Sequence, residues 1–196
     1  MNSSTICICP AAAEAESTRH FSFEMFTTID RVPEFQWNKF IPEWNLLMQH
    51  SQLKMLETVQ GHDMQFRYVL VMNNDVTVGV MYFQVVMFHA GQLINYFPEA
   101  HNWLMKLLKK FSAKLLNAIN LKMLVSGNVF MTGENGFYFS AEIEKPVRAK
   151  LLRQAVNKVL QADCSIKAVL ISDLYFPKTE FDEGFSNHRY NTITVE

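Results

Sequence analysis

The sequence is poor in the residues that build metal, disulfide and nucleophilic sites. It has three cysteines, and Cys7 and Cys9 stand too close together for a usual zinc knuckle or redox pair. The six histidines are dispersed and form no His-x-x-x-His pair. No Gly-x-Ser-x-Gly elbow and no phosphate loop ending in Gly-Lys-Ser/Thr occurs. We therefore expect no metal site, and reduced, unpaired thiols as in a cytoplasmic protein.

Charge of one sign and long apolar segments are also missing. The chain carries 18 basic and 19 acidic residues, a net charge of -1, which gives no global attraction to nucleic acid or to an anionic membrane. No run approaches the roughly 18 apolar residues of a membrane span. Residues 1–18 lack the basic start and apolar stretch of a signal peptide. These absences predict a cytoplasmic protein with no nucleic-acid partner and no membrane span.

What the chain does contain is enough apolar material for one sizeable core. Of its 196 residues, 49% are apolar and 19% charged, with 16 Phe and 11 Met, a balance that indicates one folded domain. Residues 1–19 are small and polar, so we expect a flexible tail there. The domain then covers residues 20–196.

Hydrophobic patterning predicts a mixed α/β fold. Apolar and polar residues alternate or run together in the manner of strands, and amphipathic stretches lie between them. The expected order is a strand at 21–29, helices at 33–40 and 43–59, strands at 66–72 and 76–88, a helix at 98–119, a strand at 122–130, a loop at 132–136 with an extended stretch after it, a helix at 144–161, and strands at 166–174 and 189–195. Residues 76–88 are apolar on both faces, which predicts helices covering both faces of the sheet.

The clearest local signal is a hairpin over residues 66–88. Asn73, Asn74 and Asp75 form its turn, because Asn and Asp tolerate positive φ. Gly79 interrupts the second strand, which predicts a bulge or the close approach of another group.

This hairpin resembles the second and third strands of the acyl-CoA N-acyltransferase (Gcn5-related acetyltransferase) superfamily, and the element order looks like that fold. The segment Val125-Ser-Gly-Asn-Val-Phe-Met-Thr-Gly-Glu-Asn-Gly-Phe137 is similar to a stretch of large, two-lobed bacterial acyltransferase-like proteins related to the Fem-type peptidyltransferases. The resemblance covers roughly residues 21–196 and implies the first lobe of such a protein.

The resemblance implies an acyl-CoA-dependent N-acyltransferase with acyl-CoA (acetyl-CoA) as co-substrate and a small-molecule or peptide amine as acceptor. Transfer would be direct and would need a base and an acid. The candidate catalytic residues are Glu134 and Tyr138. The candidate acyl-CoA-binding residues lie in the glycine-rich segment: Gly127, Asn128, Thr132, Gly133, Asn135 and Gly136.

Two alternatives stay open. The glycine spacing departs from the Gln/Arg-x-x-Gly-x-Gly/Ala loop that binds pyrophosphate in the family, which favours a non-catalytic, degenerate lobe that serves as scaffold or interaction domain for a second lobe or in a homo-oligomer. The high Phe and Met content also suits an unrelated domain that binds an apolar ligand or a partner.

Overall fold

The computed structural model describes the backbone of residues 2–7, 21–60, 64–89, 120–129, 136–172 and 190–195, and the side chains of residues 21–60, 64–89, 120–129 and 136–171. In chain order the elements are β1 (Asn2–Cys7), β2 (Phe21–Phe26), η1 (Ile29–Arg31), α1 (Glu34–Asn38), η2 (Leu46–Met48), α2 (His50–Gln60), β3 (Gln65–Asn73), β4 (Val76–His89), β5 (Asn120–Ser126), β6 (Phe137–Phe139), α4 (Lys145–Ala162), β7 (Ala168–Ser172) and β8 (Tyr190–Val195), where η marks a 3-10 turn.

One mixed sheet of eight strands organises the described chain. Its order is β2-β3-β4-β5-β7-β1-β8, with β6 paired to β4 outside this path. Strands β5 and β7 are parallel and are linked in sequence through α4, whereas the other pairs are antiparallel. The predicted α/β class with a mixed sheet is therefore confirmed.

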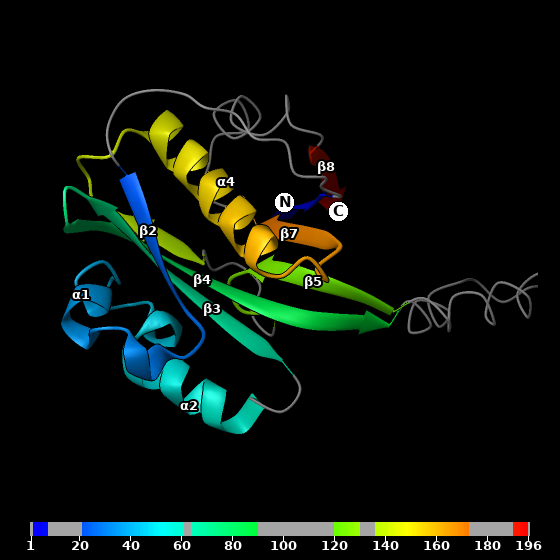
Figure 1. Cartoon of the computed structure of the whole chain (residues 1–196), viewed down its shortest axis with the longest axis horizontal. Helices are drawn as coiled ribbons and strands as arrows, with labels where there is room; N and C mark the ends of the chain where they lie inside the picture. The colour runs from blue at the N-terminus through cyan, green and yellow to red at the C-terminus, as the bar shows by residue number, and fades with distance from the viewer. Residues whose placement is uncertain are drawn as a thin grey trace, which may run out of the picture.

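Helices cover both faces of the sheet, as the doubly apolar strand β4 predicts (Figure 1). On one face α4 packs in a core that includes Leu152, Val156 and Phe83. On the other face α1, η2 and α2 pack in a second core that includes Trp37 and Tyr82. Alternate residues of β3 and β4 supply the two cores, because successive strand residues point to opposite faces.

The flexible tail predicted for residues 1–19 is not what the structure shows at Asn2–Cys7. This segment is strand β1, inserted between β7 and β8 and antiparallel to both, whereas its small polar composition predicts a flexible tail. Strand pairing supplied by distant segments outweighs weak local propensity here. The helix expected at 98–119 lies outside the described residues.

The helix expected at 43–59 begins later than predicted, because buried side chains form hydrogen bonds with backbone groups near its expected start. The Oδ1 atom of Asn45 accepts the Met48 N–H at 3.3 Å, and Trp37 Nε1 donates to the Met48 carbonyl at 2.7 Å. These bonds shape the turn η2, and α2 begins only at His50.

The hairpin β3–β4 matches its sequence signals. Asn74 and Asp75 have φ of 49° and 63°, as a two-residue turn of this hand requires. The register shifts between Val71, which pairs with Gly79, and Met72, which pairs with Thr77, so Val78 is unpaired on the β3 side and a bulge lies directly beside this glycine. A Cβ on Gly79 would also meet Phe139 Cδ1 at 2.5 Å. Both explanations foreseen for the glycine, a bulge and a close neighbour, therefore apply.

Candidate functional site

The candidate site is the point on the edge of β4, at Tyr82, where pairing with β5 ends and pairing with β6 begins; we call this point the interruption. Strands β5 and β6 both pair with the edge of β4 that β3 leaves open, β5 along Phe83–His89 and β6 along Gly79–Met81. Tyr82 joins them, since its N–H donates to the Gly136 carbonyl at 2.6 Å and its carbonyl accepts the Gly127 N–H at 3.0 Å. Gly127, directly after β5, and Gly136, directly before β6, therefore both bond to a single residue of β4.

The interruption coincides with the end of the parallel strand pair. The last paired residues of β5 and β7 are Ser126 and Ile171, and β7 ends at Ser172. Ligands of open α/β sheets bind beyond the carboxyl ends of such strands, where connections diverge. This edge is therefore the position in the described fold best suited to a ligand.

Two glycines at the interruption are required by close backbone contact. Gly127 has a φ of 93°, a conformation that side chains disfavour. A Cβ on Gly136 would overlap the N and Cα atoms of Gly127 and would lie 2.7 Å from the Tyr82 carbonyl oxygen. The structure thus brings these two predicted site residues together. Close backbone contact and a positive φ explain why both positions are glycine.

The other predicted site residues divide into two groups. Asn128 is half-buried directly after Gly127, and Tyr138 is half-buried on β6, opposite Val80. Asn45 Nδ2 donates to Tyr138 Oη at 2.6 Å, so this tyrosine is tied to the layer of α1 and α2. Thr132, Gly133, Glu134 and Asn135 lie outside the described residues.

The sequence analysis missed Gln84, which the structure places at the same point. Its side chain is fully buried; Nε2 donates to Tyr82 Oη at 2.6 Å, and Oε1 accepts the Val129 N–H at 2.8 Å. The available signal was a single amide inside the otherwise apolar run at 80–88. Burial raises the pKa of Tyr82, so its hydroxyl stays protonated at neutral pH.

The described part of the site carries little charge. Within residues 126–129 and 136–139, Tyr138 is the one ionisable side chain. The hydroxyl of Ser126 is buried and has no hydrogen-bond partner in the described structure. The amides of Gly127 and Val129 are already bonded within the chain, so neither of them can bind an external anion without giving up its present partner.

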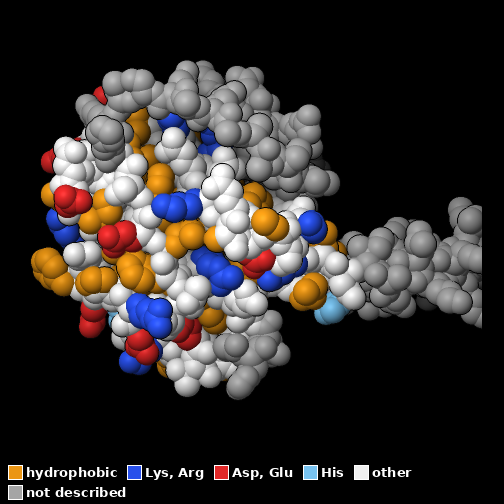
Figure 2. Space-filling view, viewed as in Figure 1, with side chains coloured by type: hydrophobic (Ala, Val, Ile, Leu, Met, Phe, Trp, Pro, Cys, Tyr) orange, Lys and Arg blue, Asp and Glu red, His pale blue; other side chains and the backbone are white. Residues whose placement is uncertain are grey.

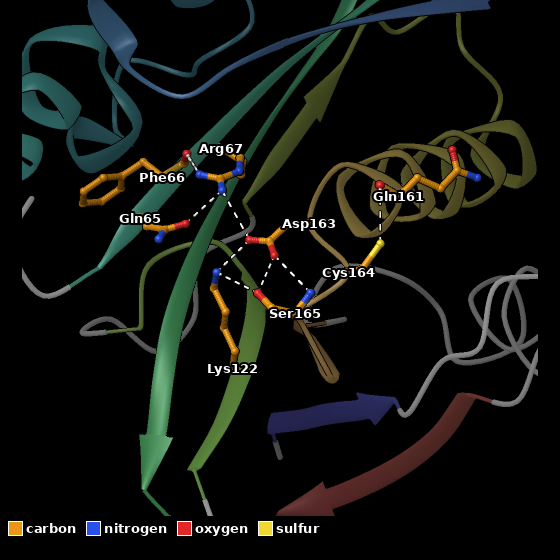
Figure 3. Close-up of polar contacts among 8 residues, drawn as sticks. All are labelled: Gln65, Phe66, Arg67, Lys122, Gln161, Asp163, Cys164 and Ser165. Carbon is orange, nitrogen blue, oxygen red and sulfur yellow. Dashed lines mark hydrogen bonds and ion pairs between the residues drawn. The ribbon is translucent and has the colours of Figure 1, made fainter.

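A second polar cluster lies at the amino ends of β3 and β5 (Figure 3). Asp163, just after α4, accepts from Lys122 Nζ at 2.7 Å and lies 3.6 Å from Arg67 Nη2. Its hydrogen bonds with Lys122 and Ser165 lower the pKa of Asp163 to about 2. Cys164 turns the other way, toward the Gln161 carbonyl (Figure 3). Because one carboxylate directly after α4 pairs with Lys122 of β5 and Arg67 of β3, we interpret this cluster as a clamp between α4 and the sheet.

The described surface shows no field of one charge sign on the face drawn in Figure 2, where basic and acidic side chains are interspersed. Large apolar side chains are exposed around α1 and α2, with Phe35 82% and Trp44 64% accessible. Within the described residues, none of the helices combines the length and apolar character of a membrane span. The same residues contain no cluster of three or more His, Cys, Asp or Glu side chains able to hold a metal ion.

Comparison with known proteins adds no assignment. No family model matches the chain, and no curated protein sequence matches it.

We predict that Gly136→Ala destabilises the fold by about 2 kcal/mol or more, because its Cβ would overlap backbone atoms that cannot rotate away. Urea unfolding followed by circular dichroism measures the change. Ser51→Ala, at an exposed position of α2, is the control and should change stability by less than roughly 0.5 kcal/mol. Equal stability of the two variants would show that the glycine contact is absent in solution.

The clamp predicts an acid-sensitive contribution to stability. The hydrogen bonds hold the pKa of Asp163 at about 2, below the ordinary value of 3.8 for a free aspartate, so the contribution is complete above pH 4 and disappears as the pH falls toward 2. Above pH 4, Asp163→Asn should cost roughly 1 kcal/mol, because solvent screens the interactions of this partly exposed carboxylate, and the gap from the parent should close near pH 2. Unfolding curves at a series of pH values test this, and a gap independent of pH would refute the assignment.

Proposed function

We propose that this chain has the acyl-CoA N-acyltransferase fold and serves transfer of an acyl group from acyl-CoA to an amine, alone or as the first lobe of a two-lobed enzyme. Its support is the strand arrangement: an antiparallel run β2-β3-β4-β5 is followed, after α4, by parallel β7. This arrangement agrees with the element order that the hairpin resemblance implies. The observation that carries the proposal is the interruption beside Tyr82, at the carboxyl edge of β5 and β7.

In the proposed reaction the amine attacks the thioester carbonyl carbon, the C–N bond forms and the C–S bond breaks. A base takes the proton of the amine, and an acid protonates the departing thiolate. Tyr138 would be the acid, since its hydroxyl can donate a proton to the thiolate. The base would be Glu134, the other predicted residue, whose position the structure does not describe.

The pyrophosphate of acyl-CoA finds no cradle among the described residues. The Gly127 and Val129 amides are bonded within the chain. The helix α4 starts beyond β6, where the Ser140 N–H donates to the Val78 carbonyl at 2.8 Å, so β6 separates its N-terminus from the interruption. Gly127, Gly136 and the first turn of α4 therefore do not fit the family's way of binding pyrophosphate.

This misfit favours a second candidate function, a non-catalytic lobe that serves as scaffold or interaction domain. Phe137 is buried in the core under α4, and Phe139 packs against the same core. The two side chains lie on β6, which occupies the edge of β4 at this point. The N–H and the carbonyl of Tyr82 are both hydrogen-bonded. A degenerate lobe would retain the fold with its edge closed in this way.

Calorimetric titration of acetyl-CoA and of a longer acyl-CoA into the purified chain distinguishes the two functions. For the transferase we predict saturable binding that Asn128→Ala weakens roughly tenfold, which is the loss of about one hydrogen bond. Asn157→Ala on α4 is the matched control, the same substitution at another half-buried position, and should leave the affinity unchanged.

Absence of binding by both thioesters would reject the transferase and support the scaffold lobe. Binding that both asparagine variants leave unchanged would place the ligand away from the interruption and would contradict the proposed site.

A further inference from the structure

Gln84 stands in surroundings that do not suit an amide. In the sheet it lies between Phe66 on β3 and Val125 on β5, and along β4 it lies between Tyr82 and Val86 on the same face. Phe66, Tyr82 and Val86 all belong to the apolar core under α1 and α2. An amide in such a place is costly unless both its polar ends are bonded.

The nitrogen and the oxygen of this amide are both hydrogen-bonded, and both partners are residues that contact or lie in the interruption. Nε2 donates to the hydroxyl of Tyr82, the residue whose backbone holds Gly127 and Gly136. Oε1 accepts the N–H of Val129, the second residue after Gly127. A methionine of similar length would fill the same space without polar atoms to satisfy, so core packing alone does not call for glutamine.

We propose that Gln84 is a positioning residue that fixes the path by which the chain leaves the sheet after β5. The backbone of Tyr82 holds Gly127 beside β4, and the side chain of Gln84 then directs the chain at Val129 toward the face of α1 and α2. This sets the orientation of Asn128 between the two anchors. Any effect on acyl-CoA binding rests on the proposed function, whereas the positioning itself does not.

The test compares Tyr82→Phe with the double variant Tyr82→Phe/Gln84→Met. The single variant removes the tyrosine hydroxyl and keeps the bond to Val129. The double variant also removes that bond. It leaves no unpaired buried hydroxyl or side-chain amide at positions 82 and 84, and the Val129 N–H belongs to an exposed residue, so the fold should survive. Gln52→Met, at an exposed position of α2, controls for the substitution itself.

Hydrogen exchange of individual amides, measured by NMR on the ligand-free chain, is the main readout. In the double variant we expect the Val129 amide to exchange roughly tenfold faster or more, as for the loss of about one hydrogen bond. The core amides of β3 and β4 should keep their protection, and the melting temperature should stay near that of Tyr82→Phe. Acetyl-CoA affinity should fall in the double variant alone.

Two results would overturn the positioning role. Unchanged Val129 exchange in the double variant would show that Gln84 does not hold this amide. A uniform acceleration across the sheet with a lower melting temperature would show that Gln84 supports the core as a whole. If no variant and no parent chain binds acetyl-CoA while Val129 alone loses protection, the transferase proposal fails and the positioning role stands.

Discussion

The backbone of Tyr82 is the point on which the rest of the structure depends. Its N–H and carbonyl bond to Gly136 and Gly127, so one residue of β4 holds both the residue that follows β5 and the residue that precedes β6. Without these bonds β5 and β6 would not be held one after the other along the same edge of β4. β6 has only three residues and depends on them most. The close contact leaves no room for a Cβ on Gly136, which ties the glycine-rich sequence to this one constraint.

The same constraint links the two cores. The Tyr82 side chain lies under α1 and α2, where its ring stacks with that of Tyr68 at a centroid distance of 5.4 Å. Its strand neighbours Met81 and Phe83 enter the opposite core under α4. Aromatic stacking adds stability beyond buried area, so the backbone bonds of Tyr82 are held rigidly from both faces. A site at the interruption is therefore built on a strand whose residues pack into both cores.

The sequence predicts the local elements well, since β3, the Asn74-Asp75 turn, β4 and α4 each follow from residues close in the chain. It predicts Gly79 correctly because a glycine in an apolar strand demands a neighbour or a bulge. It could not predict β1, whose pairing partners are distant segments, nor the long-range bonds of Asn45 and Gln84. For the site, it identified Gly127 and Gly136 as special, but their reason is backbone contact across the interruption, which only the strand register reveals.

We propose that acyl-CoA binds this fold at the edge beside Tyr82. Photo-cross-linking with an acetyl-CoA analogue that carries the reactive group on its acyl chain, followed by peptide mass spectrometry, tests it most directly. We expect labelling within the peptides that contain residues 126–129 and 136–139, and we expect excess unlabelled acetyl-CoA to abolish it. Labelling confined to other peptides, or labelling that acetyl-CoA does not compete away, would contradict it.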